Sequence, residues 1–328
     1  MLPKISIITP CYNASAYIEQ TILSIVNQDY SNLEYIIIDG GSTDGTVDII
    51  KKYEDKITYW ISEPDNGQSH AINKGIAKST GDVFNWVNGD DYLEEGALQL
   101  VGDYFQDVNL DVICTSTTLF NENGPIRVNG PTEFEEGIFH ILNSQGLNQQ
   151  GMFWRMERIK ELNGVNTKFN YSMDLDLWKR YVINYGVSKI RRNDIITGFF
   201  RLSNDSKTGS DFEENFYLFE NENNAALLQY AKYIGKKAHR GMKFLYPKFD
   251  LELSKVEPIS ILSKETLNKW INELLYIKAK RFFYAEDFRS AYLLLRCINK
   301  LYLKSEEQIN YRSFMRWSFI KRIKYFKK

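Results

Sequence analysis

Cysteine and histidine are scarce in this chain, which has three of each among 328 residues. Cys11, Cys114 and Cys297 are odd in number and far apart, so they indicate no disulfide framework and favour a reducing compartment. The histidines are equally scattered, which argues against a histidine metal site. Any metal in this protein is therefore expected on oxygen ligands.

Long apolar runs and an excess of charge are also missing. No stretch approaches the roughly 18 apolar residues of a membrane-spanning helix, and the opening apolar run is too short for a signal peptide. The formal net charge of −1 argues against a nucleic-acid partner. We therefore expect a cytoplasmic protein whose membrane contact, if any, is peripheral and at the inner face of the plasma membrane.

Glycine-rich phosphate loops are absent as well. The first apolar run leads to Pro10-Cys11-Tyr12-Asn13 without a glycine, and Gly40, Gly41 and Gly45 lack the spacing of a dinucleotide fingerprint. A Walker loop is missing too. A nucleotide would have to be bound by other means.

Short β-branched runs alternate with helical patterns in the first half of the chain. Strands are predicted at 4–9, 34–39, 58–62, 83–88 and 111–118, and helices at 14–28, 46–53, 68–79 and 171–185. This alternation indicates an α/β fold whose mostly parallel sheet is covered by helices. Residues 121–151 are rich in Asn, Gly and Pro, as expected of loops over a site.

The second half has long helical patterns instead, with helices predicted at 266–284 and 288–302 that pair as a hairpin. We place the domain boundary between residues 210 and 211, with a helical region at 211–328. Tyr311–Lys328 holds seven basic residues and no acid, with Met315, Phe319, Ile323 and Phe326 at helical spacing. This basic tail fits either an interfacial helix on anionic lipid or a solvated helix docked on its own domain.

A carboxylate pair follows the strand predicted at 83–88, in Asn88-Gly89-Asp90-Asp91. Open α/β sheets bind ligands at the carboxyl ends of their strands, and carboxylate oxygens hold Mg²⁺ or Mn²⁺, which in turn binds phosphate. Asp90 and Asp91 therefore predict metal-assisted binding of a nucleotide diphosphate, with Gly89 letting the backbone approach the ligand. An ordinary polar turn is the alternative.

Other polar positions each allow a functional and a structural interpretation. Asp39 would accept hydrogen bonds from a base or ribose, or form an Asx turn. Asp174 would be a general base, or a partner of the helix dipole. Arg201 and Lys207 lie in a polar loop that either closes over phosphates or is a solvated linker.

The order of several segments along residues 4–208 resembles that of family 2 glycosyltransferases, which have the GT-A fold. The segments are Ser6–Asn13, Ile38–Thr46, Glu63–Gln68 with Ala71–Gly75, Thr80–Asp82, Trp86–Asp91 and Met173–Trp178. The resemblance implies a nucleotide-binding sheet followed by an uncovered helical region.

The resemblance also implies roles for single residues. The implied donor-binding residues are Pro10, Tyr12, Asp39, Asn73, Asn88, Gly89, Arg201 and Lys207. Asp90, with Asp91 beside it, is implied to hold Mn²⁺ or Mg²⁺, and Asp174 to be the catalytic base. Two departures stand out: Asn88 replaces the first acid of the family's D-x-D motif, and Ser203 stands where the late loop often has His.

We therefore predict a metal-dependent, inverting glycosyltransferase. It would move a sugar from a nucleotide diphosphate, expected to be UDP, to a hydroxyl of a glycan or lipid-linked acceptor in bacterial surface polysaccharide synthesis. Two alternatives are a sugar nucleotidyltransferase, which needs a glycine- and lysine-rich loop after the first strand, and a catalytically silent glycan-binding or scaffold protein. The silent protein would be expected to have lost Asp90 or Asp174, and both are present.

Overall fold

The computed structural model describes residues 2–131, 147–203, 222, 236–245, 264–303 and 305–325. The chain forms two compact units, Met1–Phe219 and Glu220–Lys328. The boundary expected at residue 210 stays a prediction, because residues 204–221 lie outside the described ranges.

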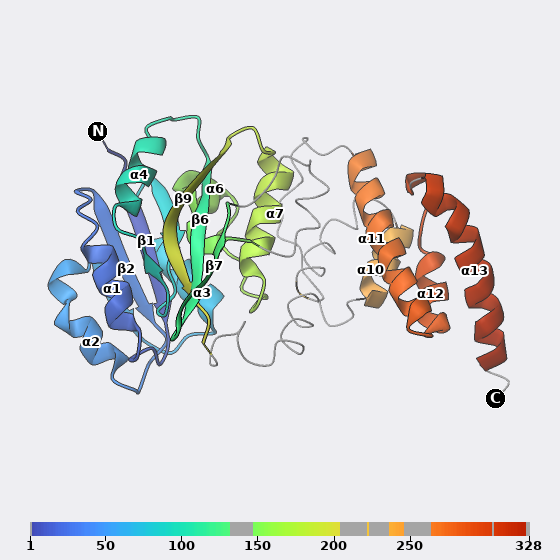
Figure 1. Cartoon of the computed structure of the whole chain (residues 1–328), viewed down its shortest axis with the longest axis horizontal. Coiled ribbons are helices and arrows are strands. Elements are labelled where there is room, and N and C mark those ends of the chain that lie inside the picture. Colours follow the sequence, from blue (N-terminus) through green and yellow to red (C-terminus); the bar gives the residue numbers. More distant parts are fainter. Residues whose placement is uncertain are drawn as a thin grey trace. The chain divides into compact units, whose positions relative to one another are not determined.

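A mixed sheet forms the centre of the first unit (Figure 1). Its nine described strands are β1 (Ile5–Cys11), β2 (Leu33–Asp39), β3 (Tyr59–Ser62), β4 (Val83–Trp86), β5 (Tyr92–Leu93), β6 (Val112–Asn121), β7 (Gly124–Asn129), β8 (Met152–Arg155) and β9 (Ile190–Arg201). Their order is β3-β2-β1-β4-β8-β6-β9-β5, and β7 pairs with β6. β1 to β4 are mutually parallel, as are β6 and β9, whereas β8 runs antiparallel to both of its neighbours.

Helices cover both faces of this sheet, as the predicted α/β class requires. They are α1 (Ile18–Val26), α2 (Thr46–Lys52), α3 (Gln68–Lys78), α4 (Ala97–Tyr104), α6 (Met156–Glu161) and α7 (Met173–Tyr185). Ile5 and Ile7 of β1 pack into a core with α1 and α4. Ile8 points the other way, toward Gly75 of α3, where an added Cβ would lie 2.5 Å from Ile8 Cγ2. Because alternate residues face opposite sides, β1 is apolar on both.

The second unit is helical, as predicted. It contains α10 (Lys236–Leu245), α11 (Lys264–Tyr284), α12 (Phe288–Leu295) and α13 (Ser305–Tyr325). α11 and α12 form the expected hairpin, with Asp287 accepting a hydrogen bond from Ser290 N at the start of α12. No helix among the described residues is long and apolar enough to cross a membrane.

Some element boundaries differ from the prediction. The helix predicted at 288–302 ends at Leu295, because Asn299 N donates to Asn272 Oδ1 of α11, 2.6 Å away, instead of to a helical carbonyl. Within 121–151, predicted as loop, residues 124–129 form β7. β7 pairs only with the outer half of β6, and such long-range pairing has little local signal in the sequence.

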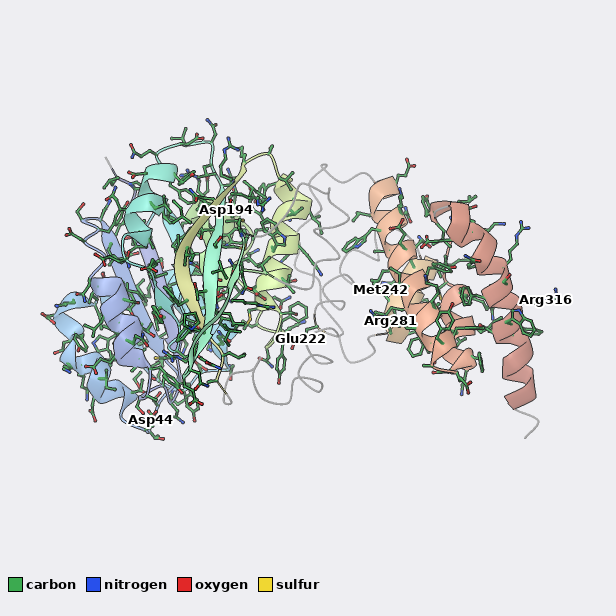
Figure 2. The ribbon with its side chains drawn as sticks, in the orientation of Figure 1. Asp44, Asp194, Glu222, Met242, Arg281 and Arg316 are labelled. Atoms are coloured by element: carbon green, nitrogen blue, oxygen red, sulfur yellow. The ribbon has the colours of Figure 1, made fainter. Side chains whose placement is uncertain are left out.

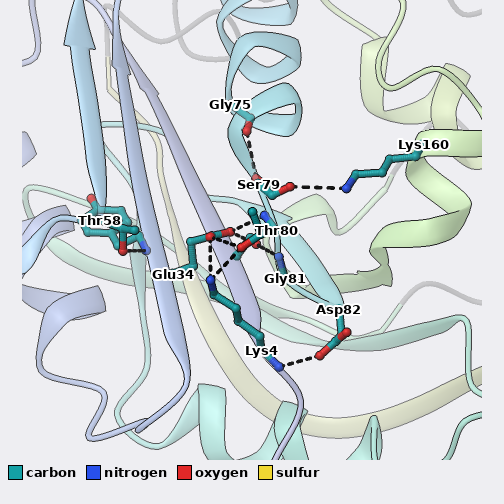
Figure 3. A network of polar contacts seen from close by, with 11 residues as sticks. Lys4, Glu34, Thr58, Gly75, Ser79, Thr80, Gly81, Asp82 and Lys160 are labelled. Carbon is teal, nitrogen blue, oxygen red and sulfur yellow. Dashed lines mark hydrogen bonds and ion pairs between the residues drawn. The ribbon is translucent and has the colours of Figure 1, made fainter.

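An ion pair between Lys4 and the buried Glu34 carboxylate secures the amino ends of the parallel strands (Figure 3). The Glu34 carboxylate of β2 lies 2.8 Å from Lys4 Nζ and accepts hydrogen bonds from Ser6 Oγ and Thr80 Oγ1, each at 2.6 Å. Burial opposes ionisation, but these donors lower the pKa of Glu34 to about 2. The network joins β1, β2 and the loop that leads into β4.

Replacing this carboxylate should destabilise the fold most at neutral pH. The unfolded carboxyl titrates near 4.5, so the network contributes fully above that pH and is lost as pH falls toward 2. We expect Glu34→Gln to lower the free energy of unfolding by about 1–3 kcal/mol at pH 7 and by less at pH 3. Urea unfolding at both pH values measures this, and an equal loss at both would show that the charge of Glu34 is unimportant.

Candidate active site

The carboxyl ends of β1, β2 and β4 meet at one edge of the sheet. Cys11 and Asp39 are register partners at the ends of β1 and β2. The turn 88–91 follows β4 and packs onto β1, because a Cβ on Gly89 would lie 2.9 Å from Cys11 Cβ and 3.3 Å from Ala14 Cβ. Gly89 was expected to let the backbone approach a ligand, but the space beside it is filled by β1 and the start of the next loop.

Asp39 holds the loop that follows β2. Its buried carboxylate accepts hydrogen bonds from Gly41 N at 3.1 Å, Ser42 N at 2.9 Å and Ser62 Oγ at 2.6 Å, and also from Ser42 Oγ. These bonds make the Asx-type turn that the sequence allowed. The contact of Asp39 with a nucleoside stays a prediction.

The other residues expected in the nucleoside pocket differ in their availability. Tyr12 is 65% exposed beside the buried Pro10. Asn73 of α3 is engaged instead: its Nδ2 donates to Val165 O at 2.8 Å, and its Oδ1 accepts from Val165 N at 2.9 Å. The amide keeps a second N–H and a second lone pair, and the contact of Asn73 with a nucleoside stays a prediction.

The two carboxylates of the turn have different surroundings. Asp91 is 1% exposed, and its oxygens accept from Arg201 N at 2.9 Å, Asn88 Nδ2 at 2.9 Å and Gln150 Nε2 at 3.0 Å. These donors occupy three of its about four acceptor sites. Asp90 is half-buried, and within the described ranges no other residue donates a hydrogen bond to its carboxylate.

Burial raises the pKa of both carboxyls. The neighbouring Asp90 also raises the pKa of Asp91, which reaches about 8. At Asp90, the positive charge of Arg201 opposes the rise in pKa. Two carboxyl groups thus lie together in a poorly solvated place, where ionising both of them is costly without a positive partner. Such a place favours a cation.

The residues of the turn fit a divalent cation through Asp90. No group of three or more His, Cys, Asp or Glu side chains in the described part of the chain is arranged to hold a metal. Mg²⁺, however, is often held by one or two carboxylates together with substrate phosphates. Asp90 suits that pattern, and the protein donors around Asp91 do not favour its predicted role as a second ligand.

Arg201 lies beside the turn, at the end of β9. Its Nε donates to Asp90 O at 2.9 Å and its Nη2 to Gln20 Oε1 at 2.6 Å. The guanidinium lies between the rings of Tyr17 and Phe120, 4.5 and 4.4 Å from their centroids. Lys207, the other cation expected here, lies outside the described residues.

Asp174 lies in the first turn of α7 and is half-buried. α3 connects its surroundings to the turn 88–91: Ser69 Oγ donates to Phe169 O at 2.8 Å, and Gln68 Nε2 donates to Asn88 Oδ1 at 2.6 Å. Asp176 has a structural contact, a buried ion pair with Arg180 at 2.7 Å. Further along α7, burial lowers the pKa of Lys179 to about 7, against the opposing charges of Asp176 and Asp174.

Several residues of this edge carry no recognisable motif. Gln150 binds Asp91, Gln20 binds Arg201, and Tyr17 and Phe120 enclose the Arg201 guanidinium. The only sequence signal is that Gln150 ends the Asn- and Gly-rich stretch at 121–151. That composition predicts a loop near a site but no particular contact.

Comparisons with known proteins agree with this architecture. Residues 6–167 match the family model described as "Glycosyl transferase family 2". The structure of S. aureus TarS 1–349 in complex with UDP-GlcNAc superposes with a TM-score of 0.61 at 16% identity, over 96% of this chain and 89% of that one. The fold is of the GT-A type. Residues 6–167 belong to glycosyl transferase family 2.

The similarity to curated relatives extends over only part of each relative's length. An uncharacterized glycosyltransferase of Haemophilus influenzae is 40% identical over 101 residues, 30% of this chain and 40% of that protein. Chondroitin synthase of Pasteurella multocida is 31% identical over 184 residues, which are 54% of this chain and 18% of that protein. The putative teichuronic acid biosynthesis glycosyltransferase TuaG of Bacillus subtilis is 32% identical over 125 residues, which are 37% of this chain and 50% of that protein. The chain thus spans half or less of these proteins.

Proposed function

We propose that this protein transfers a sugar from a UDP-sugar to an acceptor hydroxyl, with inversion and with a divalent cation at Asp90. The observation that carries the proposal is the half-buried Asp90 carboxylate at the carboxyl edge of the sheet, beside Arg201. Among the described residues, none other than Asp90 itself donates a hydrogen bond to this carboxylate. The fold is shared with TarS, whose structures contain UDP or UDP-GlcNAc, which supports UDP as the nucleotide.

The acceptor we propose is a growing surface glycan, free or linked to lipid. The named relatives support this class, because they are a chondroitin synthase and a protein of teichuronic acid biosynthesis. The donor sugar and the linkage are open to direct assay.

Each residue has a defined task in this reaction. Asp174 accepts the proton of the acceptor hydroxyl while that oxygen forms a bond to the anomeric carbon. The bond from that carbon to the diphosphate oxygen breaks on the opposite side, so the configuration inverts. A bound divalent cation supplies positive charge to the diphosphate oxygens. The guanidinium of Arg201 adds a second positive charge near the turn.

A panel of nucleotide sugars tests the proposed donor. We expect a UDP-sugar to release UDP in the presence of Mn²⁺ or Mg²⁺ and an acceptor glycan, and chelator to stop the release. Turnover that persists after complete removal of divalent cations would refute the metal-dependent reaction. A preference for another nucleotide would refute only the choice of UDP and would leave the proposed sugar transfer standing.

Asp90→Ala should abolish metal-dependent binding of the nucleotide. Asn88 cannot replace the lost charge, because it is neutral and its amide is engaged with Gln68 and Asp91. Calorimetry with UDP, with and without Mn²⁺, measures the loss. Asp82→Ala is the matched control, since Asp82 lies at the amino end of the same strand and binds Lys4 N. Equal affinities in the two variants would remove Asp90 from the metal site.

Asp174→Asn should keep donor binding while turnover falls about 10²-fold or more, the usual scale for losing a general base. The amide keeps the size and the hydrogen-bonding oxygen of the side chain but cannot accept the acceptor proton. Steady-state turnover and UDP binding are measured on the same preparation. Near-normal turnover would leave Asp174 with only a role at the start of α7.

We also propose that the basic tail at 311–328 contacts anionic membrane. The first part of α13 is docked on its own unit: Tyr311 OH donates to Leu295 O at 2.8 Å, and the ring of Phe314 packs edge-on against Phe283 at 4.8 Å. Trp317 is 53% exposed. Arg316 is exposed as well and projects from the side of α13 away from α11 (Figure 2). Docked and exposed residues thus share this helix.

Removing residues 321–328 separates the two interpretations of the tail. The deletion takes away five of its seven basic residues and leaves the contacts of Tyr311 and Phe314 intact. We expect weaker sedimentation with anionic liposomes at low salt, since each basic residue near the surface contributes on the order of 1 kcal/mol. Unchanged sedimentation together with a lower melting temperature would show that the tail only docks.

A further inference from the structure

A short segment that carries no catalytic motif, Asn148–Gly151, lies against the edge that holds the turn 88–91. Gln149 and Gln150 in this segment are adjacent glutamines, 6% and 8% exposed. Gln150 Nε2 donates to Asp91 Oδ2 at 3.0 Å. Gln149 Nε2 points to β4 instead and donates to Asn85 Oδ1 at 3.1 Å and Trp86 O at 2.9 Å.

The backbone of this segment is held by bonds that do not involve the Gln150 side chain. Asn85 Nδ2 donates to Gln150 O at 3.0 Å, and Thr115 Oγ1 donates to Gly151 O at 2.9 Å. Gly151 lies so close to β6 that an added Cβ would be 2.5 Å from Thr115 O. The Gln150 amide is therefore presented to Asp91 from a rigid support.

Asp91 connects this segment to the turn 88–91 at the carboxyl edge of the sheet. One of its oxygens accepts from the backbone N of Arg201, and the other accepts from Asn88 and Gln150. Arg201 in turn donates through Nε to the carbonyl of Asp90. The backbone of Asp90 and the end of β9 are thus both tied to the place where Asp91 is held.

A neutral donor is the appropriate partner for Asp91 at this position. A lysine or arginine here would add a positive charge that repels a cation on Asp90. The glutamine amide donates a hydrogen bond to the buried Asp91 carboxyl and adds no such charge.

We propose that Gln150 is a positioning residue for the metal and diphosphate site, acting through Asp91 without touching the metal or the donor. This inference rests on the proposed function, in which Asp90 binds the cation. Residues that orient metal ligands typically change metal affinity or activity by about 10- to 100-fold when they are replaced.

The two glutamines provide a matched pair of variants, Gln150→Met and Gln149→Met. Each substitution keeps the side-chain length and removes the amide from a buried place. Calorimetry in the presence of UDP gives the affinity for Mn²⁺, and thermal unfolding without metal gives the stability. We expect Gln150→Met to weaken Mn²⁺ binding about 10- to 100-fold and Gln149→Met to leave it unchanged, although both lower the melting temperature.

Equal Mn²⁺ affinities in the two variants would overturn the inference and leave the proposed function standing. Wild-type Mn²⁺ affinity in Asp90→Ala would overturn both. If Gln150→Met does not fold, Gln150→Asn, one methylene shorter, is compared with Gln149→Asn by the same criteria.

A double-mutant cycle with Asp91→Asn tests the route of the effect. If Gln150 acts through Asp91, the double variant should lose little more Mn²⁺ affinity than Asp91→Asn alone. Fully additive losses would mean that Gln150 acts by another path, against the inference.

Discussion

Three N–H groups from three parts of the chain donate hydrogen bonds to the buried Asp91 carboxylate, and the geometry at the carboxyl edge of the sheet depends on them. A carboxylate that water does not reach is stable only when its oxygens are hydrogen-bonded. The donors come from the turn itself, from Gln150 before β8 and from Arg201 at the end of β9. Holding this one group therefore requires β4, β8 and β9 to be correctly placed, so the edge is complete only when these strands have come together.

Buried acids at the two ends of the parallel strands have pKa values shifted in opposite directions. At the amino ends, Glu34 has a positive partner in Lys4, and its pKa falls to about 2. At the carboxyl ends, Asp91 has only neutral donors and an acidic neighbour, and its pKa rises. The compensated acid contributes stability, whereas full ionisation of the uncompensated pair of Asp90 and Asp91 requires a positive ligand. The sign of each shift thus separates a structural acid from a candidate for chemistry.

Local pattern was enough to predict the first four strands, the helices between them and the position of the turn 88–91. The partners of single side chains were not predictable, because they lie far away in the chain: Gln150 is 59 residues from Asp91, and Arg201 is 110. The same limit applies to Asp39, whose residue type allowed two roles and whose Ser62 contact comes from another strand. The early end of α12 likewise depends on Asn272 of α11, a tertiary contact that overrides local helix propensity.

Gly75 shows how finely the position of α3 is determined. The helix lies closer to Ile8 of β1 than any side chain at this position would permit, since even a methyl group would overlap it. Its first turn carries Gln68, which binds Asn88. A single carbon atom added in the middle of the helix would thus displace the carboxyl edge of the sheet, because a close-packed interior transmits such displacements. In this chain the contact leaves α3 no room to move closer to β1, so a change in the shape of the edge has to come from the loops around it.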